Sequence, residues 1–91
     1  MSISIRIPAN MRSLVDGQVR IESQADTVGK ALEALVDEYP ELNSRLFSDT
    51  GDLVSYVSVF VGDTNILDLS GMDTNLEGAS ELLIISALAG G

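Results

Sequence analysis

The sequence predicts an α+β domain in which one main helix covers one face of a four- or five-stranded sheet. Apolar and polar residues alternate over residues 2–7 and 55–61, which is typical of half-buried strands. Residues 28–39 instead carry an apolar stripe at helical spacing. One helix can cover only one face of such a sheet, so the other face must meet solvent or a partner.

The first strand is predicted over residues 2–7, where three isoleucines share one face. It ends before a proline, which cannot donate to a strand ladder. Residues 9–17 are expected to form a loop or a wide hairpin connection. A second strand follows over residues 18–23, in which Val19 and Ile21 continue the apolar face.

The main helix is predicted to begin after Asp26 and Thr27, because both are good N-cap residues. A proline at position 40 ends it, and the segment 42–47 indicates one further helical turn. The apolar stripe recurs at spacings of three and four and consists of Val28, Ala31, Leu32, Leu35, Val36 and Tyr39.

The second half of the chain adds the remaining strands. A turn at 49–52 precedes a strongly alternating strand over residues 55–61. We expect a short strand over residues 65–69 and one irregular helical turn within residues 70–78. The last strand is predicted over residues 81–88.

The phase of the strands separates a core face from an open face. We expect a core between helix and sheet that includes Leu32, Leu35, Val57, Val59 and Ile84. The open face then carries three large apolar residues beside an arginine and a serine, namely Phe60, Leu83, Ile85, Arg6 and Ser58. Such a group predicts a partner-binding patch, although single exposed apolar residues are also ordinary on protein surfaces.

Composition excludes several classes of function. Fourteen acidic and five basic residues give a formal charge of −9, which disfavours nucleic-acid binding. A basic protein partner fits this charge, and a merely solubilising surface is the alternative. The chain has no Cys and no His, so it lacks disulfides, thiolate chemistry and the usual soft metal ligands.

An enzyme active site or a metal site is not expected. The segment 49–52 lacks the length and ligand spacing of a calcium loop. Most carboxylates fall at predicted turns or on the solvated helix face, among them Asp16, Asp26, Asp37, Glu38, Asp63, Asp68 and Asp73. The first residues do not resemble a signal peptide and no apolar run reaches membrane length, so we expect a cytoplasmic protein that does not contact membranes.

The chain ends in Gly90 and Gly91. A carboxylate carried on two residues without Cβ atoms can enter a slot too narrow for other residues. The alternative is an ordinary frayed terminus. We therefore divide the chain of 91 residues into a domain over residues 1–86 and a flexible C-terminal tail over residues 87–91.

The order of elements and the terminal Gly-Gly resemble the ubiquitin-like β-grasp proteins, and within them the MoaD/ThiS family of sulfur carriers. This resemblance implies a mixed sheet. The segment 40–54 is similar to the longer members, such as the cysteine-biosynthesis carriers, with molybdopterin-synthase small subunits as the nearest alternative. The resemblance rests on Ile5-Arg-Ile-Pro-Ala-Asn-Met-Arg12, Asp26-Thr-Val-Gly-Lys-Ala-Leu32, Tyr39-Pro-Glu-Leu42, Tyr56-Val-Ser-Val-Phe-Val-Gly62 and Ala87-Leu-Ala-Gly-Gly91.

Two positions depart from the family pattern. Relatives usually have Gly-Asp before the last strand, where this chain has Gly78-Ala79-Ser80-Glu81. They tend to have a proline before the tail, where this chain has Ser86. Neither difference alters the terminal carboxylate, so the carrier chemistry is expected to be kept. What the two differences affect is which partner the chain recognises.

The resemblance implies a carrier that is a substrate and not an enzyme. An E1-like adenylating enzyme would activate the Gly91 carboxylate with ATP and magnesium, and sulfur would then displace AMP to leave a thiocarboxylate. The carrier would bind no cofactor itself. Gly90 would let the end of the chain enter the partner's active site closely. The linker between the domain and the two glycines would consist of Ala87, Leu88 and Ala89.

The partner-binding residues Phe60, Leu83 and Ile85 would dock to the activating enzyme or to the sulfur acceptor. That acceptor would be a cysteine-synthase-like enzyme or a molybdopterin-synthase large subunit. Two other functions stay open. In a protein modifier the terminal glycine would end in an isopeptide bond to a lysine, and in a non-covalent β-grasp adaptor the tail would be inert.

Overall fold

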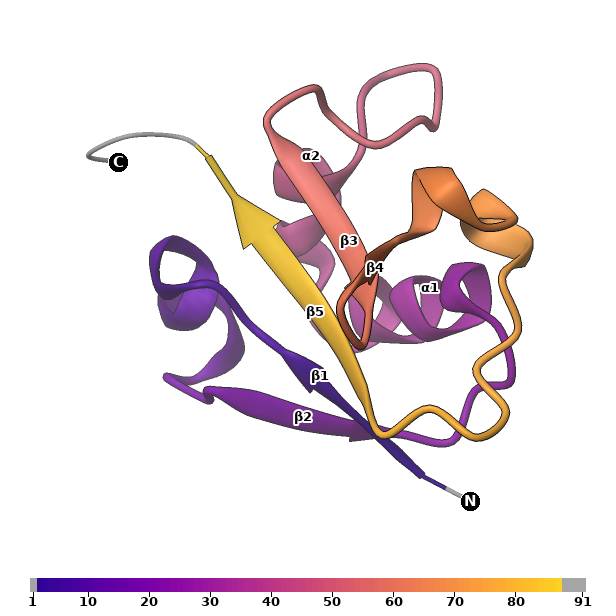
Figure 1. The fold of residues 1–91 in the computed structure, drawn as a ribbon. Coiled ribbons are helices and arrows are strands. Elements are labelled where there is room, and N and C mark those ends of the chain that lie inside the picture. Colours follow the sequence, from indigo (N-terminus) through magenta and orange to yellow (C-terminus); the bar gives the residue numbers. More distant parts are fainter. Residues whose placement is uncertain (1, 88–91) are drawn as a thin grey trace.

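A computed structural model describes residues 2–87, in which five strands form one mixed sheet with the order β2-β1-β5-β3-β4 (Figure 1). The first and last strands of the chain are parallel neighbours, and every other pairing is antiparallel. The strands are β1 (Ile3–Arg6), β2 (Arg20–Ser23), β3 (Val57–Val61), β4 (Thr64–Asn65) and β5 (Glu81–Ser86). The expected α+β architecture with a mixed sheet is confirmed.

The connection between β1 and β2 is more ordered than the sequence predicts. It contains a 3₁₀ helix, η1 (Ala9–Val15), in place of a plain loop. Its Met11 and Val15 are fully buried, so η1 closes one end of the core. Val19 does not continue the apolar face as expected, because it precedes β2 and is 41% exposed.

The helix α1 (Val28–Glu38) lies behind the sheet in Figure 1. Four residues of the predicted stripe are buried in the core, while Val36 and Tyr39, which follows the helix, are only partly buried. Its N-cap is Thr27, whose hydroxyl accepts a hydrogen bond from the Lys30 backbone N–H at 3.3 Å. After α1 the chain continues through η2 (Pro40–Leu42) and α2 (Asn43–Leu46), which supply the expected further helical turn.

The predicted strand at residues 65–69 is wrong. The strand β4 ends at Asn65, and the 3₁₀ helix η3 (Ile66–Asp68) follows it. The reason is a local side-chain contact, because the Asn65 Oδ1 accepts a hydrogen bond from the Leu67 N–H at 2.9 Å and so favours a turn over a ladder. A further 3₁₀ helix, η4 (Gly71–Asp73), is the irregular turn expected within residues 70–78.

The two long strands of the second half are shorter than predicted. The strand β3 begins at Val57 instead of residue 55, and β5 ends at Ser86. Their phase is nevertheless correct, since the core face holds alternate residues of both strands. The five predicted core residues are all buried, with exposed fractions of 0–6% at Leu32, Leu35, Val57, Val59 and Ile84.

Candidate functional site

The end of β5 is fixed to the rest of the domain from two sides. The side-chain amide of Asn10, in η1, donates a hydrogen bond to the Ser86 hydroxyl at 3.0 Å. The next residue, Ala87, donates its backbone N–H to the carbonyl of Tyr56 at 2.8 Å. The chain therefore leaves the sheet at a defined point between η1 and the start of β3 (Figure 1). Of the predicted tail residues, Ala87 is exposed here, and Leu88, Ala89, Gly90 and Gly91 lie outside the described residues.

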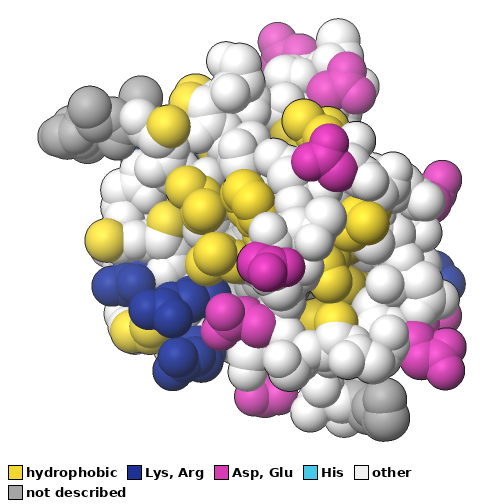
Figure 2. All heavy atoms as spheres, viewed as in Figure 1, with side chains coloured by type: hydrophobic (Ala, Val, Ile, Leu, Met, Phe, Trp, Pro, Cys, Tyr) yellow, Lys and Arg dark blue, Asp and Glu magenta, His cyan; other side chains and the backbone are white. Residues whose placement is uncertain are grey.

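The face of the sheet away from α1 brings the three predicted partner-binding residues together. Phe60 on β3 is paired with Leu83 on β5, and Ser58 is paired with Ile85. Phe60 and Leu83 are half-buried, and Ile85 is 41% exposed. Figure 2 shows hydrophobic side chains gathered over β3 and β5 on this face. We call Phe60, Leu83 and Ile85 the apolar patch.

Two arginines stand beside the apolar patch in the same row of the sheet. Arg6 on β1 is paired with Leu83 on one side and with Arg20 of β2 on the other. Directly paired residues point to the same face of a sheet, so both arginines belong to the open face. The sequence pattern placed Arg6 there but missed Arg20. Its position depends on the register of β1 against β2, and a 13-residue connection between the strands does not reveal that register.

Leu67 was also missed, because a strand was predicted where η3 forms. It is 82% exposed. It borders a hollow of about 190 Å³ together with Ser58, Val59 and Asn65, which places it at the β3–β4 edge of the sheet. The sequence did hold a signal for this turn, because an asparagine followed by two apolar residues and an aspartate can cap a short helix.

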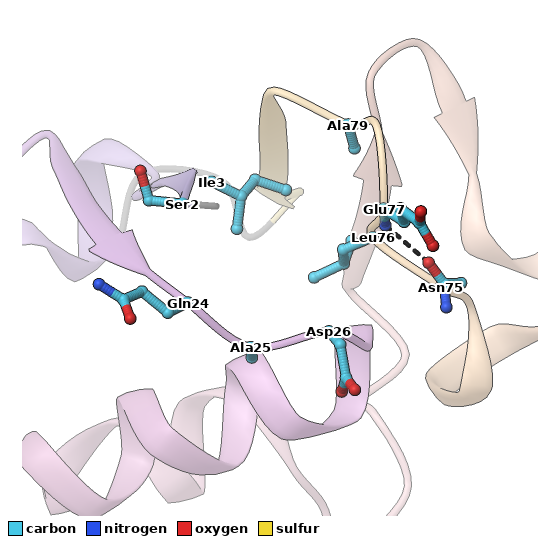
Figure 3. A pocket seen from close by; sticks show the side chains of 9 residues that line it. All are labelled: Ser2, Ile3, Gln24, Ala25, Asp26, Asn75, Leu76, Glu77 and Ala79. Atoms are coloured by element: carbon cyan, nitrogen blue, oxygen red, sulfur yellow. Dashed lines mark hydrogen bonds between the residues drawn. The ribbon is translucent and has the colours of Figure 1, made fainter.

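A separate hollow of about 420 Å³ lies at the other end of β5 (Figure 3). Ile3, Ala25, Leu76 and Ala79 supply its apolar lining. Polar side chains complete the lining, namely Ser2, Gln24, Asp26, Asn75 and Glu77, and the Asn75 side chain accepts a hydrogen bond from the Glu77 N–H at 2.7 Å. Because residue 79 precedes β5 and the tail follows it, this hollow is remote from the chain end that carries Gly91.

The described residues contain no grouping of three or more acidic side chains that could hold a metal ion. At the 49–52 turn, the Thr50 hydroxyl donates to the Asp52 carboxylate at 3.2 Å. Within residues 2–87 no helix has the length and apolar character needed to cross a membrane.

A sequence model of the ThiS family matches residues 5–91, which is nearly the whole chain. This chain belongs to the ThiS family of ubiquitin-like sulfur carriers. The sulfur carrier protein CysO of Mycobacterium tuberculosis is 28% identical to it over 93 residues, and the match covers all of both chains. The small archaeal modifier protein 3 of Haloferax volcanii is 33% identical over 94 residues, again over the full length of both.

The ThiS-family assignment agrees with the fold. A chain in the crystal structure of the BexX/CysO complex of Amycolatopsis orientalis superposes with a TM-score of 0.85 at 23% identity. That match covers 98% of this chain and 99% of the other. The ThiS-family chain therefore has the ubiquitin-like β-grasp fold that the sequence predicts.

Proposed function

We propose that this chain carries sulfur as a thiocarboxylate on Gly91. The observation that carries the proposal is the family match, which extends through the tail to residue 91. The structure supports it, because Asn10 and Tyr56 hold the end of β5 so that the tail leaves the domain at one place. We place the tail over residues 87–91 and the supporting domain over residues 1–86.

The chemistry requires a partner enzyme. The Gly91 carboxylate attacks the α-phosphorus of ATP, which forms an acyl adenylate and releases pyrophosphate. Hydrosulfide then attacks the acyl carbon, AMP leaves, and a proton is released, so that a thiocarboxylate replaces the carboxylate. ATP and magnesium belong to the E1-like enzyme, and the carrier provides only its terminal carboxyl group. The carrier itself is thus a substrate, and it acts in the cytoplasm, where ATP is available.

The apolar patch is the surface that we assign to docking. Ile85 lies two residues before Ala87, so a partner seated on the patch also reaches the start of the tail. The CysO protein of Amycolatopsis orientalis has been crystallised as a complex with BexX, which supports the idea that carriers of this fold bind a partner protein. The sulfur acceptor of this chain would be a cysteine-synthase-like enzyme or a molybdopterin-synthase large subunit.

The test incubates the chain with the E1-like enzyme of the same organism, ATP, magnesium and sodium hydrosulfide. We expect its intact mass to rise by the exchange of one oxygen for one sulfur. Oxidation of Met1, Met11 or Met72 adds nearly the same mass. An alkylating reagent separates the two, because the chain has no cysteine and alkylation at mild pH then reports the thiocarboxylate.

Two variants serve as controls. Deleting Gly91, or adding one residue after it, moves the reacting carboxylate by more than the ~1 Å that can already cost about a hundredfold in rate. Neither variant should gain sulfur. If the Gly91 deletion is modified as fast as the parent chain, the carrier function is wrong and a non-covalent adaptor takes its place.

A protein modifier is the second candidate, and the likeness to the small archaeal modifier protein 3 favours it. Both functions begin with adenylation, so loss of Gly91 abolishes both. They differ in the product. A modifier forms conjugates of higher mass through an isopeptide bond to lysine, and these survive treatment with hydroxylamine, whereas a carrier accumulates a free thiocarboxylate.

A further inference from the structure

The arginine pair Arg6–Arg20 is an arrangement that the fold itself does not explain. Side chains paired directly across antiparallel strands have Cβ atoms about 4.5–5.5 Å apart, and like charges in such pairs destabilise a sheet. Both arginines are exposed. The chain has only five basic residues, yet two of them occupy one directly paired position.

Neighbouring carboxylates compensate this charge only in part. Glu81 approaches the Nε of Arg20 at 3.7 Å, which is long for a charge-assisted hydrogen bond. The Glu22 carboxylate accepts a hydrogen bond from the Ser4 hydroxyl at 3.0 Å. No hydrogen bond or ion pair to the Arg6 side chain is found among residues 2–87. Within the described residues, Arg6 therefore has no carboxylate partner, whereas Arg20 has Glu81.

A third arginine strengthens the positive charge at this edge. The Nε of Arg12 donates to the carbonyl of Ile7 at 3.0 Å, directly beside Arg6 in the chain. Arg12 thus lies next to the β1 end of the arginine row, and Figure 2 shows Lys and Arg side chains gathered beside the hydrophobic ones, with Asp and Glu side chains adjoining them. Charges act over about 8 Å at physiological salt, so a docked partner is affected mainly by the charges at this edge, where Glu22 and Glu81 stand beside the arginines.

We propose that the open face binds a partner surface that sets a carboxylate against Arg6 and Arg20, at the edge of an apolar contact made by Phe60 and Leu83. The inference rests on the proposed function, because its partner is the E1-like enzyme. Arg6, Leu83 and Phe60 occupy one cross-sheet row, so the charged and apolar contacts form a single continuous surface. The apolar part supplies contact area, and the carboxylate fixes the orientation of the carrier and speeds its association.

The test measures the affinity of the E1-like enzyme of the same organism for full-length variants by calorimetry. Reversing the charge in Arg6→Glu should weaken binding at least tenfold. The matched control is Arg45→Glu, which makes the same change of charge at an exposed position of α2 and should bind within twofold of the parent. Raising salt should weaken the parent complex more than the complex of Arg6→Gln.

A second measurement separates docking from a structural role. If the arginine pair exists for binding, Arg6→Gln should leave the free chain as stable as the parent, or more stable, in a denaturant melt while its affinity falls. Equal affinity of Arg6→Glu and Arg45→Glu overturns the inference, and so does a loss of stability that accounts for the loss of binding. If the parent chain itself neither binds the enzyme nor gains sulfur, both the proposed function and the inference fail. If the parent gains sulfur and Arg6→Glu does so at the same kcat/KM, only the inference fails.

Discussion

Asn10 and Ser86 are 76 positions apart in sequence, yet the Asn10 amide donates a hydrogen bond to the Ser86 hydroxyl at 3.0 Å. This contact joins η1 to the last residue of β5, immediately before the tail. The hydrogen bond therefore holds the end of β5 against η1.

Removing the Asn10 amide should loosen the start of the tail. We expect Asn10→Ala to lower the free energy of unfolding by about 0.5–1.5 kcal/mol, the usual net contribution of one hydrogen bond. Sulfur loading of Gly91 should also slow, because the tail then leaves the domain over a wider range of directions. Denaturant melts and timed mass spectra measure the two effects.

Asn43→Ala is the matched control, since Asn43 is exposed on α2, and it should change stability by less than about 0.5 kcal/mol. A double-mutant cycle with Ser86→Ala isolates the pair from the other contacts of Ser86. Strict additivity of the two single changes would show that the pair does not act together.

Phe60 lies directly opposite Leu83 in the apolar patch. Phe60→Asp places a charge on the open face while the buried Val59 and Ile84 behind it stay in place. We expect the variant to keep its circular dichroism spectrum and to lose about 1–2 kcal/mol of binding to the E1-like enzyme, since apolar anchors dominate interface energies. Val19→Asp is the control, because Val19 is a 41% exposed apolar residue outside the patch. Equal affinities of the two variants would remove Phe60 from the docking surface.

Leu32 lies at the centre of the helix stripe and is fully buried. Leu32→Ala should therefore cost about 2–5 kcal/mol of stability, because it removes buried methyl groups and leaves a cavity. Leu67→Ala makes the same chemical change at a side chain that is 82% exposed, and should cost less than about 0.5 kcal/mol. Similar unfolding midpoints for the two variants would contradict the burial of the stripe.

The sequence by itself determined the helix stripe, the phase of the long strands and the apolar patch. Each of these rests on a periodicity within one element, as in residues 28–39, where spacing alone selects the buried side. The same local pattern placed Phe60, Leu83 and Ile85 on the face away from α1.

Only the tertiary structure decided which residues of different elements meet. The pairing of Arg6 with Arg20 depends on strand register, and a shift of one residue would send every side chain of β2 to the other face. The contact between Asn10 and Ser86 depends on η1 packing Met11 and Val15 into the core, which folds a segment that reads locally as a loop. Such juxtapositions arise from packing between distant parts of the chain, so no periodicity within a single segment encodes them.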